Sequence, residues 1–145
     1  MKTKLLHDAD GKRTFAIILQ TGDEAISCLK TFAERERIGG SQVTAIGALS
    51  RATLAYFDWQ TKAYQQINVG EQVEVASLIG DIAAGPDNRP RVHVHVVLGK
   101  RDGTALAGHL EEAHVRPTLE IIVTEMPTHL HKSKDKESGL ALIKL

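Results

Sequence analysis

The chain alternates short apolar runs with clusters of turn residues, and this pattern predicts a protein made mostly of β-strands. Arg13–Gln20 is an apolar run that ends at Thr21-Gly22, which is typical of a buried strand. Gly47 and Ser50-Arg51 mark expected bulges or turns within Ser41–Trp59. Further strands are predicted at Tyr64–Val69 after a hairpin tip at Asp58–Lys62, at Gln72–Ile82, on both sides of the Gly99–Gly103 turn, and at Arg116–Met126. The remaining segments are expected to form a loop or edge (Met1–Lys12), a charged loop (Thr128–Ser138) and a short apolar end (Leu140–Leu145).

One segment follows the helical period instead. Apolar residues recur at spacings of three and four between Ala25 and Ala33, so a helix is expected at about residues 23–38. Thr21 and Glu24 match the spacing of a capping box at its start. Gly39-Gly40 is expected to end it.

One helix among many strands indicates an α+β protein with a large, mostly antiparallel sheet. No internal repeat or low-complexity linker interrupts residues 1–145, so a single domain is expected. A single helix cannot cover both faces of such a sheet. Part of the sheet must therefore close on itself or be buried against another subunit, and the second outcome predicts an oligomer.

Charge and cysteine content narrow the classes of function. Lys plus Arg and Asp plus Glu both number 18, and this zero net charge argues against a broad surface for nucleic acid or anionic membrane. Cys28 is the one cysteine, so no intrachain disulfide can form, and its place on the apolar helix face favours a core position. The first residues lack the apolar run of a signal peptide, and no stretch is long enough to span a membrane. A soluble cytoplasmic protein is expected.

The segment Pro90–Glu112 contains the best candidate for chemistry. His93 and His95 are separated by one residue, so in a strand they point to the same face. If Gly99–Gly103 closes a hairpin, the next strand returns His109 to the same edge. Three neutral imidazoles with an open fourth position are typical of a reactive or ligand-binding zinc. The alternative is that these histidines are polar residues of a sheet face, hydrogen-bonded to neighbours or packed at a subunit contact.

Several segments occur in an order typical of one family: GDEAISCLKTFAERERI, IGALSRATLAYFD, VEVASLIGDIA, RVHVHVVLGKRDGTALAGHL and PTLEIIV. Together they resemble the PPC domain family (plants and prokaryotes conserved domain, DUF296) in its stand-alone prokaryotic form. The likeness extends from about Arg13 to Leu142. It implies an α+β fold with one main helix, assembly as a homotrimer, and a divalent-metal site, with zinc as the expected ion, at His93, His95 and His109.

Plant members of this family follow AT-hook DNA-binding motifs, associate with one another and with transcription factors, and carry a Gly-Arg-Phe-Glu-Ile-Leu motif. The matching positions here run from Glu71 to Ala76, where Glu74 is identical and Val75 is similar. The segment Asn88–Arg91 lacks the Arg-Gly-Arg-Pro core of an AT-hook. With 4% aromatic residues, the chain also offers little for base stacking.

Three carboxylates are candidates for an acid, a base or a hydrogen-bond partner of a ligand histidine: Glu74, Glu111 and Glu120. An exposed strand face is the alternative for Glu120. His114, expected in a loop, is a candidate fourth ligand. His129 and His131 lie in the predicted charged loop, where a solvated position is expected, and His7 is uninformative.

Three hypotheses of function follow. The first is a homotrimeric PPC-like protein with a three-histidine metal site and no assigned biochemical role. The second is a DNA-associated or transcription-regulatory binding protein. The third is a metal-dependent enzyme on a small molecule, a hydrolase or a lyase, with its catalytic residues unknown. No Ser-His-Asp pattern, Gly-rich phosphate loop or CxxC pair points to another chemistry.

Overall fold

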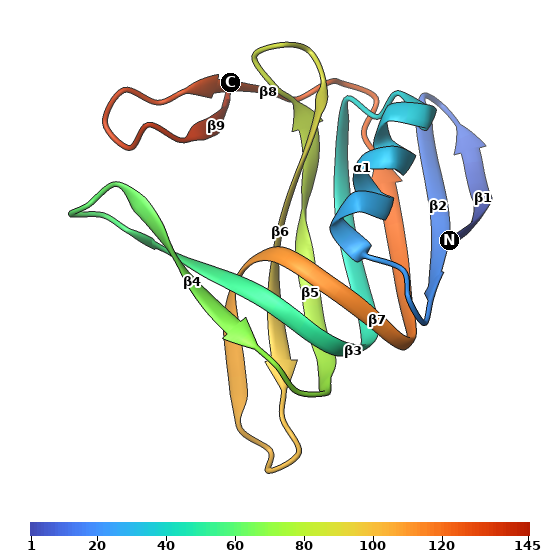
Figure 1. The fold of residues 1–145 in the computed structure, drawn as a ribbon. Coiled ribbons are helices and arrows are strands. Elements are labelled where there is room, and N and C mark those ends of the chain that lie inside the picture. Colours follow the sequence, from blue (N-terminus) through green and yellow to red (C-terminus); the bar gives the residue numbers. More distant parts are fainter.

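Nine strands and one helix make up the structure, a computed structural model that describes residues 1–145 (Figure 1). Every strand pair is antiparallel except a single parallel bridge between β5 and β8. The expected α+β class with a large antiparallel sheet and one main helix is therefore confirmed. The elements are β1 (Lys2–Ala9), β2 (Lys12–Gln20), α1 (Ala25–Glu36), β3 (Gly40–Asp58), β4 (Ala63–Val69), β5 (Val73–Ala84), β6 (Pro90–Gly99), β7 (Ala105–Glu125), β8 (His131–Lys134) and β9 (Ala141–Lys144).

The sheet runs in the order β1-β2-β7-β3-β5-β8-β9, and β4 pairs with β3. Strand β6 pairs with both β5 and β7, while β7 and β5 each pair with β3. These four strands form a closed circuit of paired backbones, so part of the sheet closes on itself. The long strands β3 and β7 bend around this circuit through bulges near Gly47 and Arg51, as the sequence predicted.

The N-terminal cap of α1 differs from the predicted capping box. The Glu24 carboxylate itself caps the helix, because it accepts the backbone N–H groups of Ile26 and Ser27 at 3.0 and 2.7 Å. Glu24 is thus the capping residue and not the distant partner of Thr21, and the capping-box prediction was wrong. The same carboxylate accepts the N–H of Ala113 on β7 at 3.0 Å, which ties the start of the helix to the sheet.

The helix also ends earlier than the sequence predicted. Arg37 adopts a left-handed backbone with φ of 55°, and its N–H donates to the carbonyls of Ala33 and Glu34. The helix therefore stops before Gly39-Gly40. These glycines serve close packing, since a Cβ on Gly39 would lie 2.4 Å from Nδ1 of His129.

Of the two outcomes expected for Met1–Lys12, a loop or an edge, the structure shows the edge: the segment contains strand β1, which forms a hairpin with β2 through Asp10 and Gly11, both at positive φ. Two other strand assignments need correction. The two strands expected on either side of residues 111–115 are one continuous strand, β7, so His114 lies in a strand and not in a loop. The expected loop at Thr128–Ser138 contains β8, which pairs with β9. Pairing with a second strand decides each of these cases.

The core lies between α1 and the sheet, where Phe15 and Phe32 meet edge to face at a centroid distance of 5.1 Å. Cys28 is partly buried against this core, as predicted, and burial raises the pKa of its thiol. The sheet also presents apolar residues outward: Ile46 and Ile79 are 60% and 58% exposed. The helix leaves this outer face uncovered. No helix is long and apolar enough to cross a membrane.

Candidate metal centre

Strand β6 places two of the predicted histidines. Val94 and Val96 are buried in the core, so the alternating residues His93 and His95 point to the opposite face of the sheet. The chain then turns and returns as β7, where His109 is the direct partner of His95. The hairpin expected from the Gly99–Gly103 segment is therefore present, and it brings all three histidines together.

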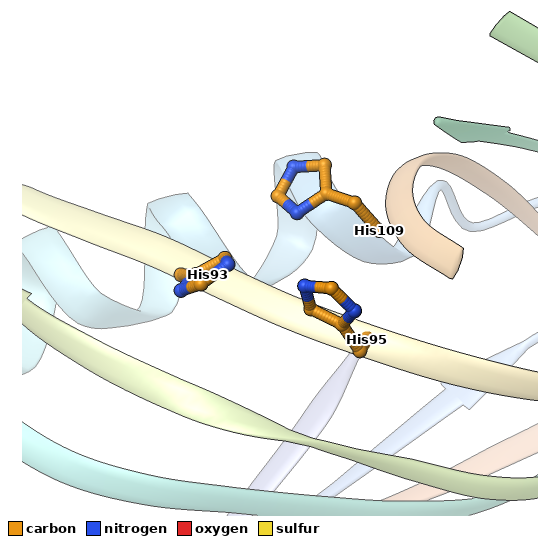
Figure 2. A group of neighbouring side chains, drawn as sticks. All are labelled: His93, His95 and His109. Atoms are coloured by element: carbon orange, nitrogen blue, oxygen red, sulfur yellow. The ribbon is translucent and has the colours of Figure 1, made fainter. Parts of the chain in front are cut away.

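The three imidazole rings surround one shared space (Figure 2). Ring centroids are 5.2 Å apart for His93 and His95, 5.2 Å for His93 and His109, and 5.4 Å for His95 and His109. Each residue offers one nitrogen, and these ligand atoms all lie within 4.8 Å of one another. Two nitrogens that are each about 2.0–2.1 Å from one zinc ion are at most about 4.2 Å apart, so ligand atoms at the 4.8 Å limit must move closer together to share the ion.

His109 is the most enclosed of the three rings. Its buried Nδ1 has no hydrogen-bond partner in the protein, and an unpaired buried nitrogen is costly unless a ligand engages it. Burial lowers the pKa of His109, and the neighbouring His93 and His95 lower it further. The ring of Tyr64, from β4, lies 5.2 Å away at a tilt of 31°. His109 is thus held as a neutral base, the form that binds a metal.

Electrostatics favour the same form in His95. Burial lowers the pKa of His95, and repulsion from a charged His93 adds to the effect. Because His95 is otherwise exposed, one side of the shared space opens to solvent. Three imidazole nitrogens with an open side fit a divalent ion that keeps one position for water or a ligand.

An ion pair between Asp81 and Lys132 lies next to His93. The carboxylate of Asp81 on β5 faces His93 across the strand pair, with Oδ2 3.4 Å from Nδ1. Its other oxygen lies 2.7 Å from the ammonium of Lys132, which is buried. Burial raises the pKa of Asp81, but the contacts with His93 and Lys132 outweigh it and leave that pKa lowered. Asp81 therefore stays charged and orients His93.

Of the three candidate carboxylates, the structure brings one to the histidines. Glu111 follows His109 on β7, its charge acts on His109 and Tyr64, and it accepts a hydrogen bond from Gln66 at 2.8 Å. Glu74 pairs with Gly99 at the far end of β6. Glu120 pairs with Ile18 and Ile46 at the opposite end of β7 from His109. Neither reaches the shared space.

The remaining histidines lie elsewhere. The Nε2 of His114 contacts Glu112 and lies 3.0 Å from a guanidinium nitrogen of Arg51, so the ring is engaged outside the three-histidine site. His7 is on the edge strand β1, His131 is the first residue of β8, and His129 lies two residues before it. Sequence reasoning missed Asp81 and Lys132. A charge in the apolar second half of the predicted strand Gln72–Ile82 was the available signal for Asp81, and none existed for Lys132.

The fold and the three histidines define a class: small α+β sheet proteins with a candidate metal site on the open sheet face. The family model described as the Plants and Prokaryotes Conserved (PCC) domain matches residues 7–127, and the chain belongs to this family. The family resemblance seen in the sequence is thereby confirmed. A comparison with curated protein sequences gave no match.

Solved structures of similar proteins support the family assignment. A metal-containing protein from Archaeoglobus fulgidus is 31% identical, with a TM-score of 0.83 over 91% of this chain and 93% of that one. A plant- and prokaryote-conserved (PPC) protein from Pyrococcus horikoshii is 30% identical, with a TM-score of 0.85 over 99% and 95%. A protein from Bacteroides thetaiotaomicron, described as a putative DNA-binding protein, is 26% identical, with a TM-score of 0.85 over 98% and 96%.

Proposed function

We propose that this protein binds a divalent metal ion, zinc by preference, through His93, His95 and His109, and that it does so as a cytoplasmic homotrimer. The unpaired, buried Nδ1 of His109 beside two further imidazoles carries the metal proposal. The description of the Archaeoglobus relative as a metal-containing protein supports it. Imidazole nitrogens suit zinc, which accepts a four-coordinate arrangement with one open position.

The chain's own residues set what the site offers. The three histidines hold the ion, Asp81 fixes the orientation of His93, and the open side leaves a position for a water or a ligand. A bound zinc ion would lower the pKa of that water and act as a Lewis acid. Glu111, next to His109 on the same strand, is the carboxylate placed to exchange a proton there. These features support a metal-dependent reaction on a small molecule as the alternative role.

The exposed sheet face supports self-association. Ile79 is the direct strand partner of His95, and Thr44 pairs with both Ile79 and Ile122, so apolar residues border the metal site on the outer face. Such a patch is typical of a subunit interface. Light scattering coupled to size exclusion should give three times the chain mass of 15.8 kDa, and a monomer would contradict the trimer.

Metal binding can be tested without an affinity tag. Protein purified this way should contain about one zinc per chain by elemental analysis. Zinc at 100 times its Kd should stabilise the fold by about 2.7 kcal/mol and raise Tm by roughly 5–10 °C. His109→Ala should abolish this rise, whereas His114→Ala, on the same strand but outside the site, should keep it. Metal-free protein with an unchanged Tm would refute the proposal.

Association with DNA is the second candidate, and the description of the Bacteroides relative supports it. Zero net charge predicts that any such binding is weak and sensitive to salt. A gel shift at low salt, repeated at about 200 mM salt, checks this. A protein that retards no DNA at low salt has no DNA-binding activity of its own.

A further inference from the structure

A second cleft lies at the other end of β6 from the hairpin turn, where the C-terminal end of α1, the β5–β6 turn and the start of β8 come together (Figure 1). Its volume is about 690 Å³, within the range of small-molecule sites. Four of its lining residues can carry positive charge, and Glu34 is its one carboxylate: the four are Arg37, Arg89, His129 and His131. None of the three proposed metal ligands lines it.

Two arginines of this cleft have no partner in the protein. Arg37 and Arg89 form no ion pair, a property they share with Arg51, Arg101 and Arg116 elsewhere in the chain. Asp87 sits in the same turn as Arg89, but it pairs with Arg91 at 2.7 Å. It also accepts the backbone N–H of Arg89 at 3.2 Å, which shapes the turn. The guanidinium of Arg89 is therefore free.

The two histidines are fixed by the backbone between them. The N–H of Leu130 donates to the carbonyl of Gly39 at 3.0 Å, and the carbonyl of Leu130 accepts the N–H of Ala84 at 2.8 Å. His129 and His131 flank this pinned residue and both line the cleft. The His129 ring lies over Gly39, where a Cβ would come within 2.4 Å of its Nδ1.

We propose that this cleft binds the phosphate group of a small phosphorylated molecule. Two unpaired arginines match the geometry of a phosphate, since each guanidinium presents a planar set of donors. His129 and His131 add ring N–H donors to the same lining. The lining contains no Phe, Trp or Tyr on which a nucleobase could stack, while Ile38, Ala84 and Pro90 offer a short apolar wall. The ligand is thus a phosphate monoester with a small, non-aromatic body.

The test is calorimetric titration of the full-length protein at low salt with inorganic phosphate and with glycerol 3-phosphate. Arg37→Gln and Arg89→Gln should each weaken binding about tenfold, and the double variant should abolish it. Arg101→Gln, in the exposed β6–β7 turn, is the matched control and should bind normally. Gly39→Ala should also weaken binding, because the added methyl group displaces the His129 ring.

Two further arms separate this site from others. His109→Ala should leave phosphate binding unchanged, because His109 does not line this cleft. A phosphate held instead by a metal at the three-histidine site would be lost in that variant. Duplex DNA should not compete at equal phosphate concentration. No binding of either probe, binding that survives the double arginine variant, or binding of DNA alone would each overturn the proposal.

Discussion

Asp81 and His93 face each other across the β5–β6 pair, with Oδ2 of the carboxylate 3.4 Å from Nδ1 of the imidazole. The other carboxylate oxygen is held by Lys132 at 2.7 Å. Asp81 therefore links a buried charge on β8 to a proposed metal ligand on β6. Carboxylates in this position orient the ring and raise its basicity toward a metal.

Replacing Asp81 with Asn should weaken zinc binding by about 10–100-fold, because the amide no longer orients His93 as a charged acceptor. A competition titration with a fluorescent chelator measures the affinity. Asp8→Asn, on the exposed strand β1, should have no effect. The double variant Asp81→Asn/Lys132→Met separates metal affinity from folding, because it removes both charges and leaves no buried ammonium unpaired. In the same titration it should still bind zinc weakly.

The ion pair of Asp81 with Lys132 predicts that the two substitutions change the free energy of unfolding non-additively. The Lys132 side chain is 5% exposed, so Asp81→Asn leaves a buried ammonium unpaired and should cost about 3–5 kcal/mol. Lys132→Met should cost less, because Asp81 is 23% exposed and keeps His93. Urea unfolding of both single variants and the double variant gives the coupling. A double-variant loss equal to the sum of the single losses would show that the pair does not interact.

The Glu24 cap of α1 predicts that the stability of the fold depends on pH. Burial raises the pKa of Glu24, but the hydrogen bonds from Ser27, Ala113 and Ile26 outweigh it and leave that pKa below its usual range. The folded state therefore binds the proton more weakly than the unfolded state, so the stabilisation is complete at neutral pH. It is lost as the pH falls from the unfolded-state pKa through the lower folded-state value.

Glu24→Ala should accordingly cost about 1–2 kcal/mol at neutral pH, and the difference from wild type should shrink in acid. Thermal unfolding monitored by circular dichroism across this pH range measures it. Glu34→Ala, on the exposed side of the same helix, should show no such trend. A difference that stayed constant with pH would mean that the carboxylate charge is not what caps the helix.

Gly80 lies opposite the proposed metal site on β5, and its lack of a side chain is required there. A Cβ would lie 2.1 Å from the carbonyl oxygen of His93 and 2.7 Å from Cα of Val94. Since these contacts are with backbone atoms, they can be relieved only by a shift of β6, and Gly80→Ala should destabilise the protein by about 1–3 kcal/mol. Zinc affinity should fall as well, because β6 must shift. Gly70→Ala meets no atom within 4 Å and serves as the control in chemical denaturation.

Local patterns in the chain were sufficient for most elements and for two of the three histidines of the site. The alternation in β6, with Val94 and Val96 inward, already placed His93 and His95 on one face. The helical period located α1, although the ends were displaced because Glu24 and Arg37 act through their own cap geometry. These features depend on neighbours a few residues apart, which the sequence shows directly.

Tertiary structure decided how His109 and Asp81 are placed around the other two histidines. The direct pairing of His109 with His95 depends on the strand register, and bulges in β3 and β7 help to set how those strands align. Lys132 comes from β8, far along the chain from Asp81 on β5, and no local pattern encodes the contact between them. The sequence by itself thus determined the fold class and the chemical type of the ligands. Only non-local strand pairing decided which side chains share one space, because register is a property of two strands and not of either one alone.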